Sequence, residues 1–339
     1  MSRTSKLILI LVALGGAHLA VALAGFLAPY DPSEQDRALP WAPPSNIRFV
    51  DADGGFHLRP FVYRQIRDPS APASYIEDLE QRYPLRLFVS GSAYTVLGVL
   101  HGRTHLLGVE EPARLSLFGR DSLGRDVFSR LLYGGQISLL TGLLAAAFSL
   151  LLGTALGAIS GFYGRWIDSS IMRASELFMA LPWLYLLLAV RALLPLGISP
   201  KQTFLLLILL LGTVGWARPA RLVRGVVLAL REGPLVESAR GLGATDARIL
   251  LRHVLPQTGA VILTQGALLI PQYILAEVTL SFLGLGISEP TPSWGTMLHN
   301  LQKLSVMSAP YWWMLAPAVA LLFLFVAYHS LARTMQSSP

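Results

Sequence analysis

The residues that could do chemistry in this chain lie mostly in two short charged stretches. One covers residues 119–130 and reads GRDSLGRDVFSR; the other covers residues 237–256 and reads ESARGLGATDARILLRHVLP. Neither stretch contains the phosphate-binding pattern G-x-x-x-x-G-K-[ST], the zinc motif H-E-x-x-H or the nucleophile motif G-x-S-x-G. The charged groups therefore predict docking for the second stretch and either ion pairing or helix capping for the first, and we expect this chain not to be an enzyme.

The composition predicts a protein that crosses a membrane several times. Of its 339 residues 53% are hydrophobic and only 14% are charged, whereas a soluble domain carries about 25% charged residues. The chain has no cysteine, which excludes a disulfide framework and cysteine-based metal sites.

The distribution of charge argues against nucleic acid as a partner. Residues 29–118 carry nine Lys or Arg and eleven Asp or Glu, a net charge of −2. Because the whole chain has a net charge of +7, the remaining residues together carry +9. Those cations fall in short breaks between apolar segments, which is the positive-inside pattern of inner-membrane proteins.

The apolar segments predict six spans with both termini in the cytoplasm, at 7–28, 137–162, 171–194, 204–217, 261–285 and 312–331. We read residues 1–28 as an uncleaved anchor, although Ala22-Leu23-Ala24 also resembles a signal-peptidase site. Residues 29–118 form an enlarged extracytoplasmic loop or small subdomain with short strands at 85–89 and 94–100. Residues 119–339 form a five-helix core with a cytoplasmic loop at 232–256.

Three features of the predicted spans concern packing or binding. Gly153, Gly157 and Gly161 follow Ser149 at four-residue spacing, so small side chains line one helical face and allow another helix to approach closely. Glu277 lies within an apolar span, where it either hydrogen-bonds a neighbouring helix or lines a pathway. His101 and His105 have metal-like spacing but no third ligand, so we predict no metal site.

Few other ionisable groups, Glu176 and Arg191 among them, fall inside the spans. An ion-coupled carrier normally places such groups at mid-membrane, so this class is less favoured. A membrane hydrolase is also disfavoured, because Ser138 and Ser149 have no histidine in neighbouring spans. The energy for any transport must then come from another subunit.

The second charged stretch resembles the EAA loop of permease subunits in ABC importers. It has Glu237-Ser238-Ala239, then Gly243, then Leu255-Pro256, with the spacings of the family pattern. Ser238 stands where the pattern has Ala, and His253 stands where it has Ile. We expect Gly243 to provide the tight turn between two short helices and Pro256 to end the second one before the fifth span.

Two more segments resemble the oligopeptide, dipeptide and nickel permease family. One is the motif of Asp121, Gly124, Arg125, Asp126 and Arg130; the other combines LSFLGLG at 280–286 with PSWG at 292–295. The segments at 61–63 and 83–89 look like the microcin C/oligopeptide subgroup, which is a weaker resemblance.

This resemblance implies an all-α type I ABC importer fold in the bacterial inner membrane and import of peptides or peptide-like solutes. Nickel chelates, glutathione or opines are alternative cargoes. The implied partners are a second homologous permease, two ATPase subunits that bind ATP and Mg, an extracytoplasmic solute-binding protein and membrane lipid. This chain would bind no cofactor itself. The residues implied to couple to the ATPase are Glu237, Ser238, Ala239, Gly243, Leu255 and Pro256.

Overall fold

The computed structural model describes residues 2–71, 74–96, 99–180, 182, 185–186, 188–189, 199–302 and 311–336. The chain divides into two compact units. The helical unit comprises Met1–Val12, Leu140–Leu280 and Leu324–Pro339, and the mixed unit comprises Ala13–Leu139 and Ser281–Phe323. These boundaries fall inside helices, whereas the division predicted at residues 28 and 118 follows membrane topology, so that division stays a prediction.

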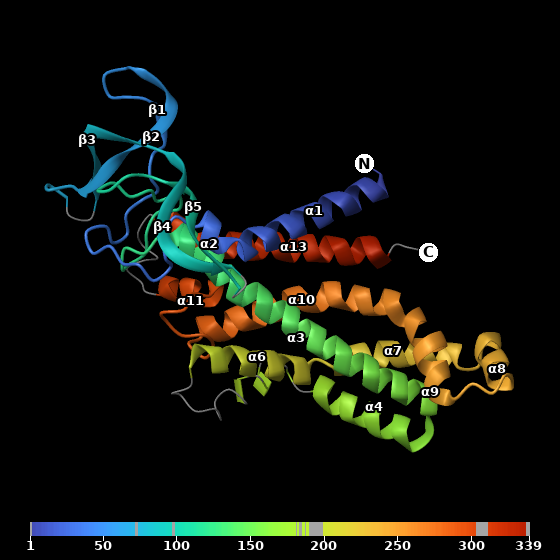
Figure 1. Ribbon diagram of the computed structural model, residues 1–339. Helices are drawn as coiled ribbons and strands as arrows, with labels where there is room; N and C mark the ends of the chain where they lie inside the picture. Colours follow the sequence, from blue (N-terminus) through green and yellow to red (C-terminus); the bar gives the residue numbers. More distant parts are fainter. Residues whose placement is uncertain are drawn as a thin grey trace. The chain divides into compact units, whose positions relative to one another are not determined.

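Within the described residues, helices joined by turns and short loops form the helical unit, and further helices belong to the mixed unit (Figure 1). The α-helices are α1 Arg3–Ala22, α2 Ala24–Leu27, α3 Val127–Tyr163, α4 Arg165–Ala180, α6 Pro200–Val214, α7 Ala217–Leu230, α8 Pro234–Gly241, α9 Asp246–Ile249, α10 Gly259–Phe282, α11 Trp294–His299 and α13 Ala316–Gln336. A π turn, η1 Leu250–Val254, and the 3₁₀ turns η2 Leu255–Thr258, η3 Asn300–Gln302 and η4 Trp312–Leu315 connect them.

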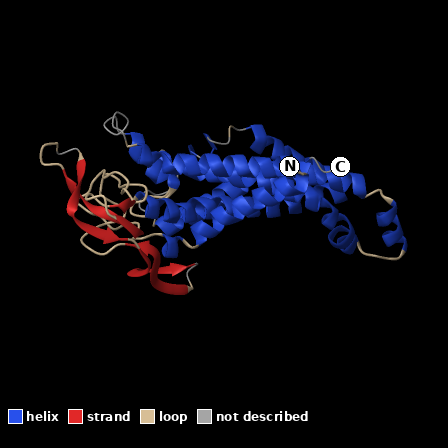
Figure 2. Ribbon diagram, turned by 90° about the horizontal axis from the view of Figure 1, so that it is seen from above, coloured by secondary structure: helices blue, strands red, loops and turns tan. Residues whose placement is uncertain are grey.

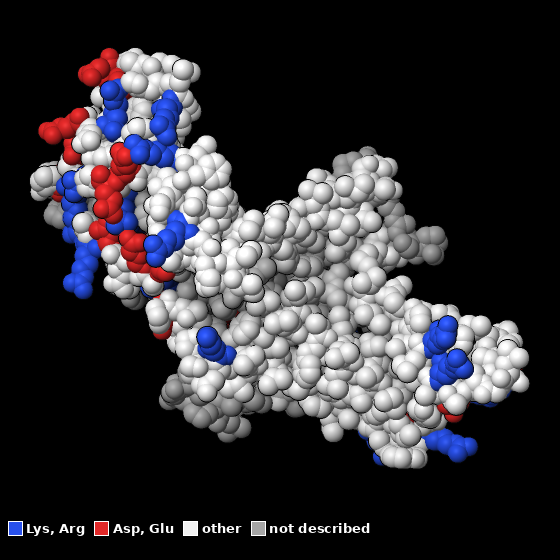
Figure 3. All heavy atoms as spheres, viewed as in Figure 1, with Lys and Arg blue, Asp and Glu red and all other residues white. Residues whose placement is uncertain are grey.

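Within the described residues, four helices are long and apolar enough to cross a membrane, namely Thr4–Ala22, Val127–Tyr163, Asp246–Phe282 and Trp312–Gln336. The bent pair α6 and α7 makes a fifth if it is counted as one span. The predicted third span begins in α4, but most of residues 181–198, Arg191 included, lie outside the described residues. On the face drawn in Figure 3, the surface of the helices is largely free of charged atoms.

The stripe of small residues on α3 packs against the backbone of α7. A Cβ added at Gly153 would lie 2.7 Å from the carbonyl oxygen of Trp216, and one at Gly161 would lie 2.9 Å from that of Arg224. At Gly157 an added Cβ would overlap the carbonyl oxygen of Ala220. Glycine is therefore required at these positions because two helix backbones meet there.

The predicted fourth span, 204–217, lies within α6 and reaches only the first residue of α7, and these two helices meet at an angle of 42°. The break lies at Gly215, where any side chain would collide with the hydroxyl of Tyr273 on α10. The Ser149 hydroxyl donates to the carbonyl of Gly212 at 2.9 Å and lies 2.7 Å from the Tyr273 hydroxyl, which must then be the donor. A buried hydrogen-bonded group thus joins α3, α6 and α10 beside the break.

An ion pair fixes α4 to α7 at the other end of the glycine stripe. Arg224 donates to both oxygens of Asp168, at 2.5 and 2.6 Å, and the hydroxyl of Ser160 on α3 donates to the same carboxylate. Hydrogen bonding by Arg224 holds the pKa of Asp168 below its usual range. Three helices therefore share one carboxylate.

The mixed unit contains all the strands of the described residues, which are red in Figure 2. Strands β1 Arg48–Val50, β2 Phe56–Arg67 and β3 Tyr75–Pro84 form an antiparallel sheet in that order. Strands β4 Arg86–Val96 and β5 Leu100–Gly108 form a separate antiparallel hairpin. An all-α fold describes the helical core but not this segment.

The two short strands predicted at 85–89 and 94–100 are wrong in detail. One strand, β4, contains residues 86–89 of the first prediction and 94–96 of the second, and an irregularity in pairing lies between Ser90 and Tyr94. Leu100, the last residue of the second prediction, begins β5. Gly91 lies against the ring of His105, whose Nδ1 is 2.6 Å from the carbonyl oxygen of Ala28. His105 is therefore a buried structural residue that joins the hairpin to the end of α2.

Replacing Gly157 by alanine should destabilise the helical unit, because the added methyl group must push α3 away from α7. Overpacking of this kind costs about 1–3 kcal/mol. Thermal unfolding in detergent, followed by tryptophan fluorescence, should show a lower Tm. Gly225→Ala is the matched control, since an added Cβ there meets nothing within 4 Å. A Tm for Gly157→Ala equal to that of the control would contradict this packing.

Candidate functional site

The predicted loop consists of two short helices, α8 and α9, separated at Gly243. Gly243 has a φ of 78°, which an L residue rarely adopts. The N–H of Ala244 donates to the carbonyl of Ala239, and the N–H of Gly243 donates to that of Arg240. These two bonds form a Schellman motif, in which a glycine just after the helix satisfies its last carbonyl groups.

Buried side chains join this loop to the spans. Val236 of α8 and Ile249 of α9 are 2% and 0% exposed, and they pack with Val223 and Val227 of α7. Ala239 and Ala244, whose backbones are hydrogen-bonded in the Schellman motif, both pack against this hydrophobic cluster. The loop is therefore attached to α7 and, through Phe162, to α3.

The opposite side of the loop carries exposed side chains that do not pack into the core. Leu242 is 88% exposed and Leu251 is 64% exposed. Glu237 and Ser238 are also exposed, and Glu237 makes no side-chain hydrogen bond or ion pair within the described part of the chain. Exposed leucines beside an unpaired carboxylate are a surface suited to a protein partner.

The expected role of Pro256 as the end of the second helix is wrong. Residues from Asp246 to Phe282 form one continuous helical path, because the π turn η1 and the 3₁₀ turn η2 carry the chain past the proline. Proline lacks an N–H, and local 3₁₀ or π geometry tolerates that loss. Leu255 is partly buried against the cluster that holds the loop, whereas Pro256 is exposed.

The first charged stretch folds into a tight turn that leads into α3. The Asp121 carboxylate accepts hydrogen bonds from the backbone N–H groups of Leu123 and Arg125, at 2.9 and 3.0 Å. Gly124 has a φ of 73°, and a side chain there would collide with the backbone of Asp36. The left-handed φ and the close approach of Asp36 both explain why position 124 is a glycine.

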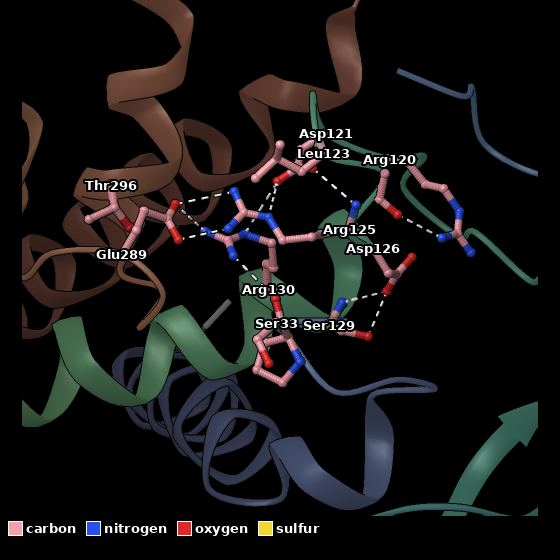
Figure 4. A network of polar contacts seen from close by, with 12 residues as sticks. Ser33, Arg120, Asp121, Leu123, Arg125, Asp126, Ser129, Arg130, Glu289 and Thr296 are labelled. Carbon is pink, nitrogen blue, oxygen red and sulfur yellow. Dashed lines mark hydrogen bonds and ion pairs between the residues drawn. The ribbon is translucent and has the colours of Figure 1, made fainter. Parts of the chain in front are cut away.

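Two buried arginines of this stretch bind one carboxylate from a distant loop (Figure 4). Arg125 donates to both oxygens of Glu289, at 2.7 and 3.2 Å, and Arg130 donates to one of them at 2.8 Å. Arg125 also pairs with Asp121 at 2.7 Å. The arginine side chains are 5% and 1% exposed, whereas that of Glu289 is 43% exposed.

Asp126 directly precedes α3, and its carboxylate caps the helix. Its Oδ2 accepts from the backbone N–H and the hydroxyl of Ser129, at 2.7 and 2.6 Å. Its Oδ1 is buried without a hydrogen-bond partner, as is Nη2 of Arg120. Burial raises the pKa of Asp126 to about 6. The sequence allowed either capping or ion pairing for this stretch, and the structure contains both.

Sequence reasoning missed Glu289 and misplaced Trp294. Glu289 lies more than 150 residues after its arginine partners, and nothing local predicts that pairing. A tryptophan just after a predicted span suits the aromatic belt at the membrane interface, and we expect Trp294 there. It is instead 3% exposed, and its Nε1–H donates to the carbonyl of Leu131 on α3 at 2.8 Å. Both residues fasten the segment after α10 to the first turns of α3.

Glu277 is fully buried within α10. It takes part in an interaction with another group of the chain, so the residue is not without a partner in the interior. Its role in packing or in a pathway stays a prediction.

Replacing Glu289 by glutamine should destabilise the mixed unit, because Arg125 and Arg130 would keep only Asp121 as a counter-ion. We expect a loss on the order of 1–3 kcal/mol, less than for a wholly buried pair. Thermal unfolding of the purified protein measures it. Glu110→Gln is the control, since its pair with Arg86 is exposed on both sides; equal effects of the two substitutions would rule out a structural role for the network.

The titration of Asp126 should be visible in the pH dependence of stability. Since its folded pKa lies near 6 and above its unfolded value, the folded state binds more protons between about pH 4 and 6. Stability from this group is therefore lost as pH rises through 6. Asp126→Asn keeps a capping oxygen, so its Tm should exceed that of the wild type by more at pH 7 than at pH 5. A difference that does not change with pH would refute this assignment.

Comparison with known proteins supports the resemblance of the sequence to permease subunits of ABC importers. The family described as "Binding-protein-dependent transport system inner membrane component" matches residues 153–337, more than half of the chain. The dipeptide transport system permease protein DppC of Alkalihalophilus pseudofirmus is 35% identical over 230 residues, which cover 68% of this chain and 73% of that protein. The glutathione transport system permease protein GsiD of Escherichia coli is 40% identical over 227 residues, covering 67% and 72%.

A structure of the MetNI methionine ABC transporter in an inward-facing conformation aligns with 61% of this chain and 95% of its own, at a TM-score of 0.47 and 17% identity. That likeness is distant, and the assignment rests on the sequence relatives. The chain belongs to the family of binding-protein-dependent transport system inner membrane components, which includes the dipeptide and glutathione permeases.

Proposed function

We propose that this chain is the permease subunit of an ATP-driven importer that carries short peptides or peptide-like solutes across the bacterial inner membrane. Relatives named for dipeptide and glutathione transport support this substrate class and favour it over nickel chelates or opines. The chain does no chemistry itself. ATP and Mg are bound by two ATPase subunits, and a second, homologous permease completes the pathway.

The observation that carries this proposal is the loop α8–Gly243–α9. Its buried side is fixed to α7 and α3, and its exposed side presents Glu237 and Leu242. A surface that is both exposed and rigidly attached can transmit a partner's movement to the spans. ATP-driven closure of the ATPases then shifts the spans between two states, because each state makes different contacts with the ATPases.

The remaining parts of the assembly follow from this role. The arginine-rich start of α7 and the loop lie on the cytoplasmic side, as the positive-inside rule requires, with both termini on that side. The strands of the mixed unit and the turn at Asp121 then face the extracytoplasmic solute-binding protein. Membrane lipid surrounds the spans.

Gly243→Val should abolish binding of the ATPase subunits while the spans remain inserted. A left-handed residue costs roughly 1–2 kcal/mol when it carries a Cβ, and a branched side chain costs more. The Schellman motif should therefore open and disorient α9. Co-purification with the ATPases and ATP-dependent uptake of a dipeptide into proteoliposomes measure both effects.

Gly241→Val is the matched control, because Gly241 is helical and an added Cβ there meets nothing within 4 Å. It adds the same side chain two residues away without backbone strain. If Gly243→Val retained ATPase binding and uptake at the level of this control, the docking role of the loop would be refuted.

A further inference from the structure

A cavity of about 510 Å³ lies within the helical unit, and the function proposed above assigns it no role. Phe178 and Met179 of α4 form one wall, and Leu269 and Leu275 of α10 form another. The end of α6, the start of α7 and Phe325 of α13 complete it. The cavity is therefore built at the break between α6 and α7, where the helix turns aside.

The polar groups of this cavity are cationic or neutral. Arg218, Gln272 and Tyr273 line it, and none of the lining residues within the described part of the chain carries a carboxylate. The Tyr273 hydroxyl is already bonded to Ser149. Arg218 and Gln272 are exposed, so both can reach a solute that enters.

Arg218 differs from the two arginines that follow it on α7. Arg221 lies 3.6 Å from Glu176, and Arg224 is paired bidentately with Asp168. Arg218 makes no such pair within the described part of the chain, although it follows the same three-residue spacing. The chain thus neutralises two of three successive cations and leaves the one in the cavity available.

We propose that this cavity receives the translocating peptide and that Arg218 pairs transiently with its terminal carboxylate. This inference rests on the proposed function. A free carboxylate is common to short peptides whatever their side chains, and one fixed cation can recognise it. The volume falls within the range of small-molecule sites. Apolar walls with an adaptable methionine accept varied side chains, and the Gln272 amide can bond to the peptide backbone.

The test uses the complete transporter in nanodiscs without nucleotide, and the photoreactive dipeptide alanyl-p-benzoylphenylalanine as probe. Cross-links of the wild type should map to Phe178, Met179, Leu269 or Leu275. Arg218→Gln should reduce their yield by about tenfold, as expected for one charge-assisted hydrogen bond, and Arg218→Lys should restore most of it. Arg221→Gln is the matched control one helical turn away and should change the yield less than twofold.

The C-terminal amide of the same dipeptide keeps the test independent of protein folding. In the wild type it should cross-link about tenfold less than the free acid, and Arg218→Gln should not reduce it further. Equal labelling by acid and amide, or cross-links outside the cavity, would overturn the proposal. ATP-dependent uptake of the free acid by the wild type distinguishes failure of the Arg218 site from failure of the proposed function. Uptake without labelling of the cavity would overturn only the Arg218 site. Absence of any uptake would overturn the proposed function.

Discussion

The contact on which the rest of the helical unit depends is the approach of α3 to α7, backbone against backbone. Gly157 allows α3 to reach the carbonyl of Ala220. Asp168 of α4 then accepts hydrogen bonds from both helices, from Ser160 of α3 and Arg224 of α7. The hydrophobic cluster that holds the cytoplasmic loop draws residues from both helices. A wider spacing would open that cluster, so the loop keeps its place only while these two helices remain in close contact.

The mixed unit is held together by different means. Around the start of α3, charged groups are paired within a buried network, and Trp294 donates to a backbone carbonyl. Such contacts are directional, and each requires its partner to be present. The helical unit depends mainly on close packing between helices, whereas this region depends on matched hydrogen bonds and charges.

Most features of the fold that the sequence predicted follow from the spacing of apolar and small residues and from the backbone freedom of glycine. The four-residue spacing of Gly153, Gly157 and Gly161 identified a packing face, and the left-handed turn at Gly243 separates two short helices as expected. Local patterns could not reveal Glu289 as the partner of Arg125, since the pairing depends on the folded loop. Trp294 was misplaced because a tryptophan near a span end serves equally well in an interface or a core. Pro256 was misjudged because neighbouring turns compensate for its missing donor.

That compensation has a consequence for how the loop faces its surroundings. The π turn at 250–254 winds the chain less per residue than an α-helix, and the 3₁₀ turn at 255–258 winds it more. Placed back to back, the two deviations offset each other in rotation. The total rotation across the two turns is therefore close to that of an α-helical segment with as many residues. A single residue inserted between them would rotate the loop about the span axis, leaving its own fold intact but aiming it in another direction.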